Sequence, residues 1–370
     1  MYIFKPKRLL FFSLLYICIN VGSACNTNKS KQVLISCKNP ALSYMGRVGI
    51  SDSPYVFYWS GTSVEMDFEG EQVNVTLKDE TGNNYFYVIL DGKPINKLQP
   101  DTSVHSYNLV TEPIVGKHTI QIFKLTEESH GRTWFYGFGI NNGGKLLQKN
   151  SIKKRKIEFY GNSITSGYSI EDTTGDSKKP EFFNNYLTYA AIIARHYNSE
   201  YSCISKSGIG ITVSWFPIIM PELYDRLDPL DSASKWDFSR FTPDIIVINL
   251  LSNDIVLYNK PQNKNFINRF GINIPNGAYV VAAYKSFILS LRNKYPNSYI
   301  ICTLDDWMES MYNSNVWHNY INTATKSLND SKILSYFFSY SHQNRKCHPK
   351  IKEHEELARG LINFIDANVK

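Results

Sequence analysis

Hydrophobic and polar residues alternate along the first third of the chain. The alternation is clearest in residues 64–68, 73–77, 85–90, 118–125 and 133–140. Turn residues such as Asp91-Gly92 punctuate these runs. A period of two with turns of this kind is typical of antiparallel strands that bury one face. The pattern predicts an N-terminal antiparallel β-sandwich of the jelly-roll type over residues 33–145.

The pattern changes after Asn141-Asn142-Gly143-Gly144. Short apolar runs predict buried strands at residues 157–160, 201–205, 244–250 and 299–304. Helices are predicted at residues 185–197, 278–294, 316–328 and 351–365. Strands that alternate with helices indicate a parallel sheet covered on both faces. We therefore expect a three-layer α/β domain over residues 155–370, with its reactive groups at the carboxyl ends of the strands.

The N-terminus carries an export signal. Lys5, Lys7 and Arg8 precede an apolar run over residues 9–21. A membrane-spanning helix needs about 20 apolar residues, so this run is too short to span and instead fits the core of a signal peptide. We expect residues 1–24 to be removed on export.

Cys25 follows the small residues that end this segment, in a pattern that resembles a bacterial lipobox. Gly22 stands where a larger aliphatic residue is usual. The pattern predicts a lipoprotein of the periplasm or cell surface, anchored through Cys25 and followed by a polar tether at residues 25–32. Simple secretion is the alternative.

Composition narrows the candidate partners. The formal charge is +7, but the basic residues are scattered apart from a run at residues 153–156, which reads as a solvated linker. No electrostatic track for nucleic acid is therefore expected. Aromatic residues make up 14% of the chain, which suits either sugar binding or the filling of β-sheets. Membrane contact is expected only through the lipid anchor, and nothing in the sequence indicates an oligomeric state.

Four cysteines lie beyond the export segment: Cys37, Cys203, Cys302 and Cys347. They form no CxxC pair and no cluster with histidine, so a structural metal is not expected. Cys203 and Cys302 lie in apolar runs and are expected to be buried thiols. An exported protein can form disulfides, but the spacing assigns none.

Ser163 lies directly after the strand predicted at residues 157–160, within Gly161-Asn162-Ser163-Ile164-Thr165. A serine at a strand-to-helix junction is well placed as a nucleophile, because the backbone N–H groups there face the developing charge. Thr165 breaks the GxSxG pattern of α/β-hydrolases. A helix N-cap is the alternative role for this serine.

Two further polar segments follow the same logic. Asn253 comes after the strand at residues 244–250, where its amide could donate to an oxyanion or simply complete a turn. His348 precedes Pro349 just before the last helix. Proline favours an extended backbone at His348 and starts the helix well, so this histidine suits a general base. The other histidines, including His354 within that helix, are expected to be structural or exposed.

Together these segments resemble the SGNH hydrolase superfamily. Gly161-Asn162-Ser163 resembles its first block, Ser207-Gly208-Ile209-Gly210 its second, Leu251-Ser252-Asn253-Asp254 its third and His348-Pro349 its fifth. With a jelly roll in front, the chain is similar to carbohydrate esterase family 2 from about residue 33 to its end. The resemblance implies a metal-free and cofactor-free serine esterase that deacetylates a polysaccharide or oligosaccharide.

The resemblance also implies roles for single residues. Ser163 would be the nucleophile and His348 the general base. The oxyanion hole would combine the backbone N–H groups of Ser163 and Gly208 with the Asn253 side chain.

Three positions depart from the superfamily pattern. Asn162 replaces the usual aspartate beside the nucleophile. Leu251 replaces a glycine and would narrow the site. Arg345 stands three residues before His348, where an aspartate is common. The resemblance to family 2 therefore implies a Ser-His dyad. Asp305 and Asp306, which end another strand, are the candidates for an orienting acid.

Two other functions remain open: a lipase-like or thioesterase-like hydrolase, and a non-catalytic glycan-binding lipoprotein. Trp215, Trp307 and Trp317 would line a sugar site or fill the core.

Overall fold

The computed structural model describes residues 1–2, 32–50, 53–141, 143–149, 153, 155–312, 316–339 and 347–370, and for residues 306–308 it describes only the backbone. Apart from residues 1–2, the predicted signal peptide lies outside the described residues, as do Cys25 and Arg345. Among the helices within those ranges, none is long and apolar enough to cross a membrane.

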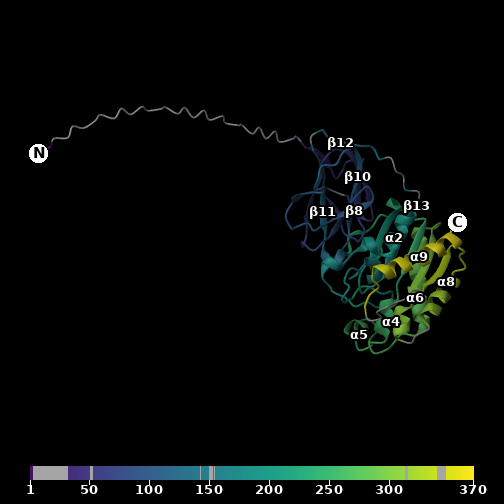
Figure 1. The fold of residues 1–370 in the computed structure, drawn as a ribbon. Coiled ribbons are helices and arrows are strands. Elements are labelled where there is room, and N and C mark those ends of the chain that lie inside the picture. The colour runs from purple at the N-terminus through teal and green to yellow at the C-terminus, as the bar shows by residue number, and fades with distance from the viewer. Residues whose placement is uncertain are drawn as a thin grey trace. The chain divides into compact units, whose positions relative to one another are not determined.

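The first domain is a sandwich of two six-stranded sheets (Figure 1). One has the order β3-β4-β11-β6-β9 with β1 paired to β11, and the other β12-β5-β10-β7-β8 with β2 paired to β5. All of these pairings are antiparallel. The strands follow one another along the chain as β1 (Val33–Ser36), β2 (Ser43–Met45), β3 (Val48–Gly49), β4 (Tyr55–Phe57), β5 (Ser63–Glu69), β6 (Val73–Asp79), β7 (Phe86–Leu90), β8 (Lys93–Leu98), β9 (His105–Asn108), β10 (Lys117–Lys124), β11 (Thr133–Ile140) and β12 (Lys145–Leu146).

The alternation in the sequence explains the core of this sandwich. In β5, Val64, Met66 and Phe68 are buried, and the residues between them are partly exposed. The buried residues of both sheets meet in one hydrophobic cluster. The jelly-roll prediction is therefore confirmed.

The second domain is built on a five-stranded parallel sheet with the order β14-β13-β15-β16-β17. Its strands are β13 (Arg155–Gly161), β14 (Ser199–Ser205), β15 (Ile245–Asn249), β16 (Tyr299–Asp305) and β17 (Ile333–Phe338). Its helices are α1 (Ser163–Ser166), α2 (Tyr189–His196), α3 (Met220–Leu223), α4 (Ser252–Tyr258), α5 (Lys264–Phe270), α6 (Gly277–Lys294), α7 (Asp306–Met311), α8 (Trp317–Lys326) and α9 (Ile351–Asn368). Short 3-10 helices in this domain are η2 (Pro180–Phe182), η3 (Asn185–Leu187) and η4 (Phe238–Arg240), and the sandwich contains another, η1 (Glu128–His130).

Helices cover both faces of this sheet (Figure 1). Ile245 and Val247 of β15 pack in a cluster with α2 and α9. Ile246 and Ile248 point the other way, into a cluster with α6 and α8. Every residue of β15 is buried, as expected for a strand between two helical layers. The predicted α/β three-layer fold is confirmed.

One predicted helix differs from the structure, and one edge strand was missed. The helix expected at residues 185–197 is divided, because η3 comes first and the Thr188 side chain then caps α2 by accepting from the Ala191 N–H at 3.3 Å. The edge strand β17 was not predicted. Its residues are mostly half-buried and do not alternate.

The two domains pack into one compact unit, Gln32–Lys370. Arg47 of the sandwich is completely buried against the second domain, where it donates to the backbone carbonyls of Tyr224 and Arg226 at 2.6 and 2.9 Å. Its guanidinium also pairs with the buried Glu158 carboxylate of β13 at 3.3 Å. Buried polar contacts of this kind fix the two domains relative to each other.

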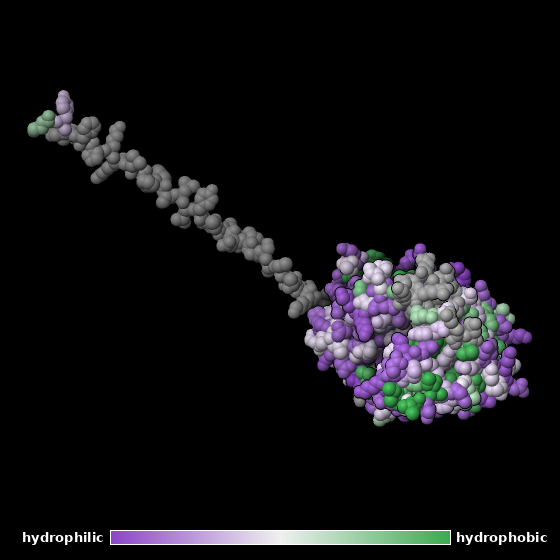
Figure 2. All heavy atoms as spheres, turned by 90° about the horizontal axis from the view of Figure 1, so that it is seen from below, coloured by the Kyte–Doolittle hydropathy of each residue, from purple (hydrophilic) through white to green (hydrophobic). Residues whose placement is uncertain are grey.

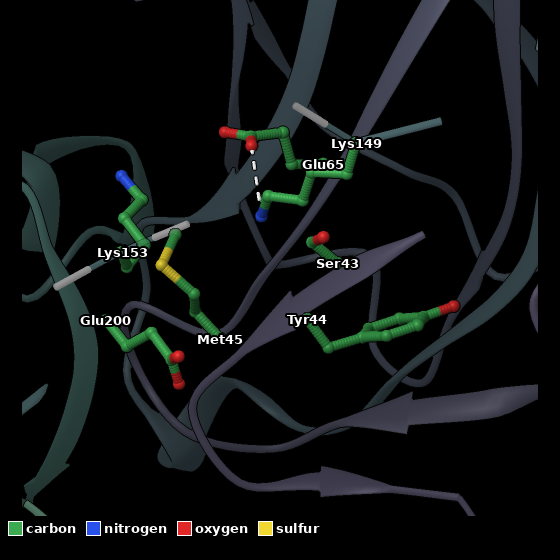
Figure 3. Close-up of a pocket in the computed structure, with 7 residues that line it drawn as sticks. All are labelled: Ser43, Tyr44, Met45, Glu65, Lys149, Lys153 and Glu200. Carbon is green, nitrogen blue, oxygen red and sulfur yellow. Dashed lines mark ion pairs between the residues drawn. The ribbon is translucent and has the colours of Figure 1, made fainter. Parts of the chain in front are cut away.

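A hollow of about 290 Å³ also lies at the domain boundary (Figure 3). Its walls come from β2 and β5 of the sandwich, the connecting segment and β14. They include an ion pair between Glu65 and Lys149 at 3.5 Å. None of the predicted site residues lines this hollow.

The surface mixes hydrophilic residues with small hydrophobic groups, as the face in Figure 2 shows. Among the exposed hydrophobic side chains, Ile267, Ile272, Ile274 and Tyr279 belong to α5, the loop after it and the start of α6. Asn265 of α5 donates to the Trp215 carbonyl at 2.7 Å, so this apolar surface adjoins the loop that follows β14.

Candidate active site

The predicted site residues meet at the carboxyl ends of three neighbouring strands. The last residue of β13, Gly161, pairs in register with Ser205 of β14 and with Asn249 of β15. Ser163, Gly208 and Asn253 each follow one of these strand ends. His348 joins them from the segment before α9.

Local sequence explains how Ser163 is presented. Asn162 is the N-cap of α1, and its side chain accepts from the Ile164 N–H at 3.1 Å. The capping role considered for Ser163 therefore belongs to Asn162, which leaves the Ser163 hydroxyl available. A side chain at Gly161 would lie 2.0 Å from the Thr165 hydroxyl, so only glycine allows this turn.

Ser163 and His348 are in direct contact. The Ser163 Oγ lies 2.8 Å from the His348 Nε2. Only 8% of the Ser163 surface is exposed, and the Tyr168 ring packs 4.7 Å from the imidazole. An imidazole nitrogen at this distance can accept the hydroxyl proton, which is the requirement for activating a serine.

The other ring nitrogen contacts a carboxylate. The His348 Nδ1 lies 2.7 Å from the Asp176 Oδ2, and the His348 backbone N–H donates to both carboxylate oxygens at 3.0 Å. Burial favours the neutral acid, but the hydrogen bonds and charge of His348 outweigh it and lower the pKa of Asp176 to about 2, with a further contribution from Lys350. Asp176 is therefore ionised at neutral pH and fixes the ring tautomer.

The loop that carries Asp176 has two anchors. The Asp172 carboxylate accepts from the backbone N–H groups of Thr174, Gly175 and Ser177 at 2.8, 3.1 and 2.8 Å. The Lys350 ammonium donates to the Gly175 carbonyl at 2.7 Å and to the Asp176 Oδ1 at 3.1 Å. The histidine and acid segments are thus joined directly.

Sequence reasoning missed Asp176 and expected a dyad, which the structure corrects to a Ser-His-Asp arrangement. Asp305 is buried at the end of β16, and its Oδ2 accepts from the Ser252 hydroxyl at 3.0 Å. The Asp306 side chain lies outside the described atoms. The only available signal was the polar, turn-rich segment Glu171–Ser177 after the nucleophile, which holds two aspartates.

The proposed oxyanion donors also lie together. Gly208 has φ of +84°, and a side chain there would meet Phe216 and Trp215 at 3.2 and 3.3 Å, so the loop requires glycine. The Asn253 Nδ2 donates at 2.9 Å to the backbone carbonyl of Ile209, the residue that follows Gly208. Asn253 thus sits against the Gly208 loop, where its amide and the backbone N–H groups can serve one oxygen.

Comparisons with known proteins identify the family of the chain. A family model described as "Carbohydrate esterase 2 N-terminal" matches residues 44–149. The structure is similar to that of a family two carbohydrate esterase from Clostridium thermocellum in complex with cellohexaose, with 31% identity and a TM-score of 0.76. That match covers 88% of this chain and 98% of the other. The chain belongs to carbohydrate esterase family 2.

Two sequence relatives accompany this family 2 assignment. The chain is 33% identical over 337 residues to the cellulase/esterase CelE of Acetivibrio thermocellus, covering 87% of this chain and 39% of CelE. It therefore spans well under half of CelE. It is 25% identical over 366 residues to an acetylxylan esterase / glucomannan deacetylase of Cellvibrio japonicus, covering 96% of this chain and 97% of that protein.

Leu251 departs from the usual pattern without narrowing this family 2 site. Its side chain is completely buried in the core beneath α4. The backbone keeps the left-handed conformation that glycine would adopt, with φ of +86°. The expected obstruction beside Asn253 is therefore corrected, because the side chain points into the core.

The three tryptophans fall into different settings. Trp215 is 39% exposed, and its Nε1 donates to the Asn253 Oδ1 at 3.1 Å. Trp317 is buried against Tyr258 and Tyr320. The Trp307 side chain lies outside the described atoms. Of the two candidates whose side chains are described, Trp215 is the one that offers a surface beside the site.

The remaining candidate residues are structural. His354 is buried in α9, where its Nδ1 accepts from the Tyr189 N–H at 3.1 Å, and burial lowers its pKa to about 3. Cys203 and Cys302 are buried thiols, as predicted, and burial raises the pKa of both, to about 12 for Cys302. In the part of the chain that the structure describes, no cluster of three or more His, Cys, Asp or Glu side chains could hold a metal ion.

Proposed function

We propose that this protein is a serine esterase that removes O-acetyl groups from a polysaccharide or oligosaccharide. The observation that carries the proposal is the continuous chain of contacts from the Ser163 Oγ through the His348 ring to the Asp176 carboxylate, set within a family 2 fold. Fold alone would not suffice, because one fold serves many activities.

The first half of the reaction acylates Ser163. The His348 Nε2 takes the hydroxyl proton as the Ser163 Oγ attacks the acetyl carbonyl carbon. The resulting tetrahedral oxyanion accepts hydrogen bonds from the backbone N–H groups of Ser163 and Gly208 and from the Asn253 side chain, the interaction that contributes most to catalysis of this type. Asp176 stabilises the imidazolium that forms.

The second half releases acetate. The protonated His348 donates its proton to the departing sugar oxygen, which leaves an acetyl-Ser163 ester. His348 then takes a proton from water as the water oxygen attacks this ester. Collapse of the second tetrahedral intermediate expels Ser163, which regains its proton from His348, and yields acetate.

The carbohydrate assignment has two supports. One similar structure holds cellohexaose, and one relative is named acetylxylan esterase / glucomannan deacetylase. The second support is Trp215, whose half-exposed ring lies beside Gly208 and Asn253. An aromatic face beside the reacting ester can pack on the apolar face of a sugar ring.

We also propose that the protein is exported and anchored through Cys25. The supports are the basic and apolar pattern of residues 1–24 and the position of Cys25. Expression of the Cys25→Ser variant should move the protein from the membrane fraction to the soluble fraction. Equal membrane retention of both proteins would contradict the anchor.

The decisive test compares wild type with Ser163→Ala for release of acetate from acetylated xylan and acetylated glucomannan. The matched control is Ser239→Ala, because Ser239 is an exposed serine in η4, which carries none of the site residues. We expect loss of activity only in Ser163→Ala. Equal rates in wild type and Ser163→Ala would remove Ser163 as the nucleophile.

Substrate series separate the other two functions that the sequence left open. Rates that rise with acyl chain length on 4-nitrophenyl esters would favour a lipase-like enzyme. Glycan binding without acetate release would favour a binding protein. The contact between the Asp176 carboxylate and the His348 ring argues against a non-catalytic binding protein, because the site contains the orienting acid that was not found in the sequence.

A further inference from the structure

One loop of the jelly roll reaches the predicted oxyanion hole. Residues 125–132 connect β10 with β11 and contain η1. Glu127 in this loop is only 4% exposed. Its Oε2 accepts from the Ser207 hydroxyl at 2.6 Å and from the Ser207 backbone N–H at 3.0 Å. A carboxylate of the first domain thus binds the residue that immediately precedes Gly208 in the second.

Ser207 is a junction between three parts of the site. Besides its two bonds to Glu127, its hydroxyl lies 3.3 Å from the Ser166 Oγ. Ser166 in turn donates to the Ser163 carbonyl at 3.1 Å. The peptide that joins Ser207 to Gly208 carries the Gly208 N–H, so whatever holds Ser207 also sets the direction of that donor.

A second acidic residue of the loop strengthens the same junction. The Glu128 carboxylate is buried and pairs with the Lys206 ammonium. Burial raises the pKa of Glu128, and the Lys206 charge opposes that effect. Burial would lower the pKa of Lys206, but Glu128 outweighs it and raises the value. Glu127 and Glu128 therefore bind two consecutive residues, Ser207 and Lys206.

The loop is held firmly by its own domain. The fully buried Lys124 ammonium donates to the carbonyls of Thr126 and Glu127 at 2.9 and 3.3 Å, and burial lowers its pKa to about 8. The Asn84 amide donates to the carbonyls of His130 and Gly131 at 3.0 and 3.2 Å. These hydrogen bonds hold Glu127 in a fixed position. A fixed acceptor for Ser207 is what accurate placement of the neighbouring Gly208 N–H donor requires.

We propose that Glu127 is a positioning residue for catalysis, through which the jelly roll orients the Gly208 N–H of the oxyanion hole. The inference rests on the proposed esterase function and deepens it. Donors aimed in advance at the position of the oxyanion lower the barrier, and removing one such donor costs about 10²–10³ in kcat. Loosening a donor without removing it costs less.

The test uses the full chain with three single variants and one double variant. Glu127→Gln keeps the volume and removes the charge that Ser207 faces, and Ser207→Ala removes the hydroxyl from the other side. Glu80→Gln is the matched control, because Glu80 binds Arg132 at the far end of the same loop, at 2.9 and 3.0 Å. Rates are measured on 4-nitrophenyl acetate and expressed per active site, counted by labelling with a fluorophosphonate.

We expect Glu127→Gln to lower kcat about 10-fold with KM within about twofold of wild type. Glu80→Gln should keep the wild-type kcat. The double variant Glu127→Gln/Ser207→Ala should be little worse than Glu127→Gln alone. Both changes act mainly on the 2.6 Å contact between these two side chains, and the other contact of the Ser207 hydroxyl, with the Ser166 Oγ, is longer at 3.3 Å. A purely structural role would instead lower the melting temperature and the number of active sites, with an unchanged kcat per site.

The rate of fluorophosphonate labelling provides an independent readout, since it needs the nucleophile and the oxyanion hole but no sugar ester. Slower labelling of Glu127→Gln than of wild type would support the positioning role, whether or not the wild type cleaves acetylated sugars. A wild type that is labelled but cleaves no acetylated sugar would contradict the esterase proposal alone. Labelling and kcat per site within twofold of wild type would overturn the positioning role alone. A wild type that neither labels nor cleaves would overturn both.

Discussion

Asp176 combines two tasks at the scale of a single residue. Its carboxylate accepts from the His348 ring and from the His348 backbone N–H, so it fixes both the tautomer and the position of the imidazole. Lys350 contacts the same carboxylate at 3.1 Å. An anion held by these donors stays ionised, which is the state that supports an imidazolium during catalysis.

Replacing Asp176 with asparagine should lower kcat by about 10²- to 10⁴-fold, because an amide leaves the histidine in the wrong tautomer. The control is Asp305→Asn, at the buried carboxylate that contacts Ser252 instead. We expect that variant to lose less than about tenfold. Steady-state kinetics on 4-nitrophenyl acetate measure both effects, and a larger loss in Asp305→Asn would reverse the assignment.

The same residue predicts how stability depends on acidity. The pKa of Asp176 falls from an ordinary 3.8 to about 2 on folding. A carboxyl group with a lowered pKa stabilises the fold above its ordinary pKa, and that contribution disappears as the pH falls through the folded value. The difference between wild type and Asp176→Asn in the free energy of unfolding, about 2 kcal/mol by this linkage, should therefore shrink between pH 4 and pH 2. Urea titrations across this range measure it, and a constant difference would contradict the linkage.

The sequence predicts a site residue when the residue is placed by a regular element, and it misses one that is placed by the folding of a loop. Ser163, Gly208 and Asn253 follow strand ends, and parallel strands bring their carboxyl ends to one edge, so pattern alone could group them. Asp176 and Glu127 lie in loops without periodicity. Their partners are chosen by how the loops fold back, which no spacing in the sequence records.

At the scale of elements, the start of α4 illustrates a conflict between backbone and core. Leu251 adopts φ of +86° at the N-cap while its side chain fills the core. A left-handed residue with a side chain costs roughly 1–2 kcal/mol, whereas truncating a buried leucine costs about 2–5 kcal/mol. Burial therefore outweighs backbone strain, and leucine is tolerated where glycine is usual.

Substitution by glycine should reveal both terms. Leu251→Gly should be destabilising, but by about 1–2 kcal/mol less than Leu250→Gly, because only the first relieves a left-handed backbone. Leu250 is the matched control, since it is equally buried and precedes Leu251 directly. Chemical denaturation gives both free energies of unfolding. Equal losses in the two variants would show that the backbone at Leu251 is not strained.

The elements themselves were predictable where burial imposes a period. The alternation in β5 and the fully buried β15 gave clear patterns. The edge strand β17 did not, because its half-buried residues face neither a full core nor open solvent. The start of α2 was predicted too early, since the capping Thr188 was read as part of the helix.

At the scale of the whole molecule, Arg47 is a buried charge shared between the domains. It pairs with Glu158 at 3.3 Å, and both side chains are completely buried. Glu158 also accepts from the Tyr160 hydroxyl at 2.6 Å. Removing one partner of such a pair leaves an uncompensated buried charge.

Arg47→Met should therefore lower the free energy of unfolding by about 3–5 kcal/mol. The double variant Arg47→Met/Glu158→Gln should recover part of this loss, because it removes the stranded charge. Lys235→Met is the control, at an exposed pair with Asp225 whose loss should cost less than about 1 kcal/mol. Denaturation followed by tryptophan fluorescence measures all three, and a double variant less stable than Arg47→Met would argue against the charge as the cause.

The loop from β10 to β11 has a consequence for recombination. The sandwich is joined to the parallel-sheet domain by the connecting segment and also by side-chain contacts. Glu127 accepts a hydrogen bond from Ser207, and Glu128 forms an ion pair with Lys206. A chimera that keeps the parallel-sheet domain but takes its sandwich from another protein would need this loop. It would also need a substitute for the hydrogen bonds by which Lys124 holds the loop.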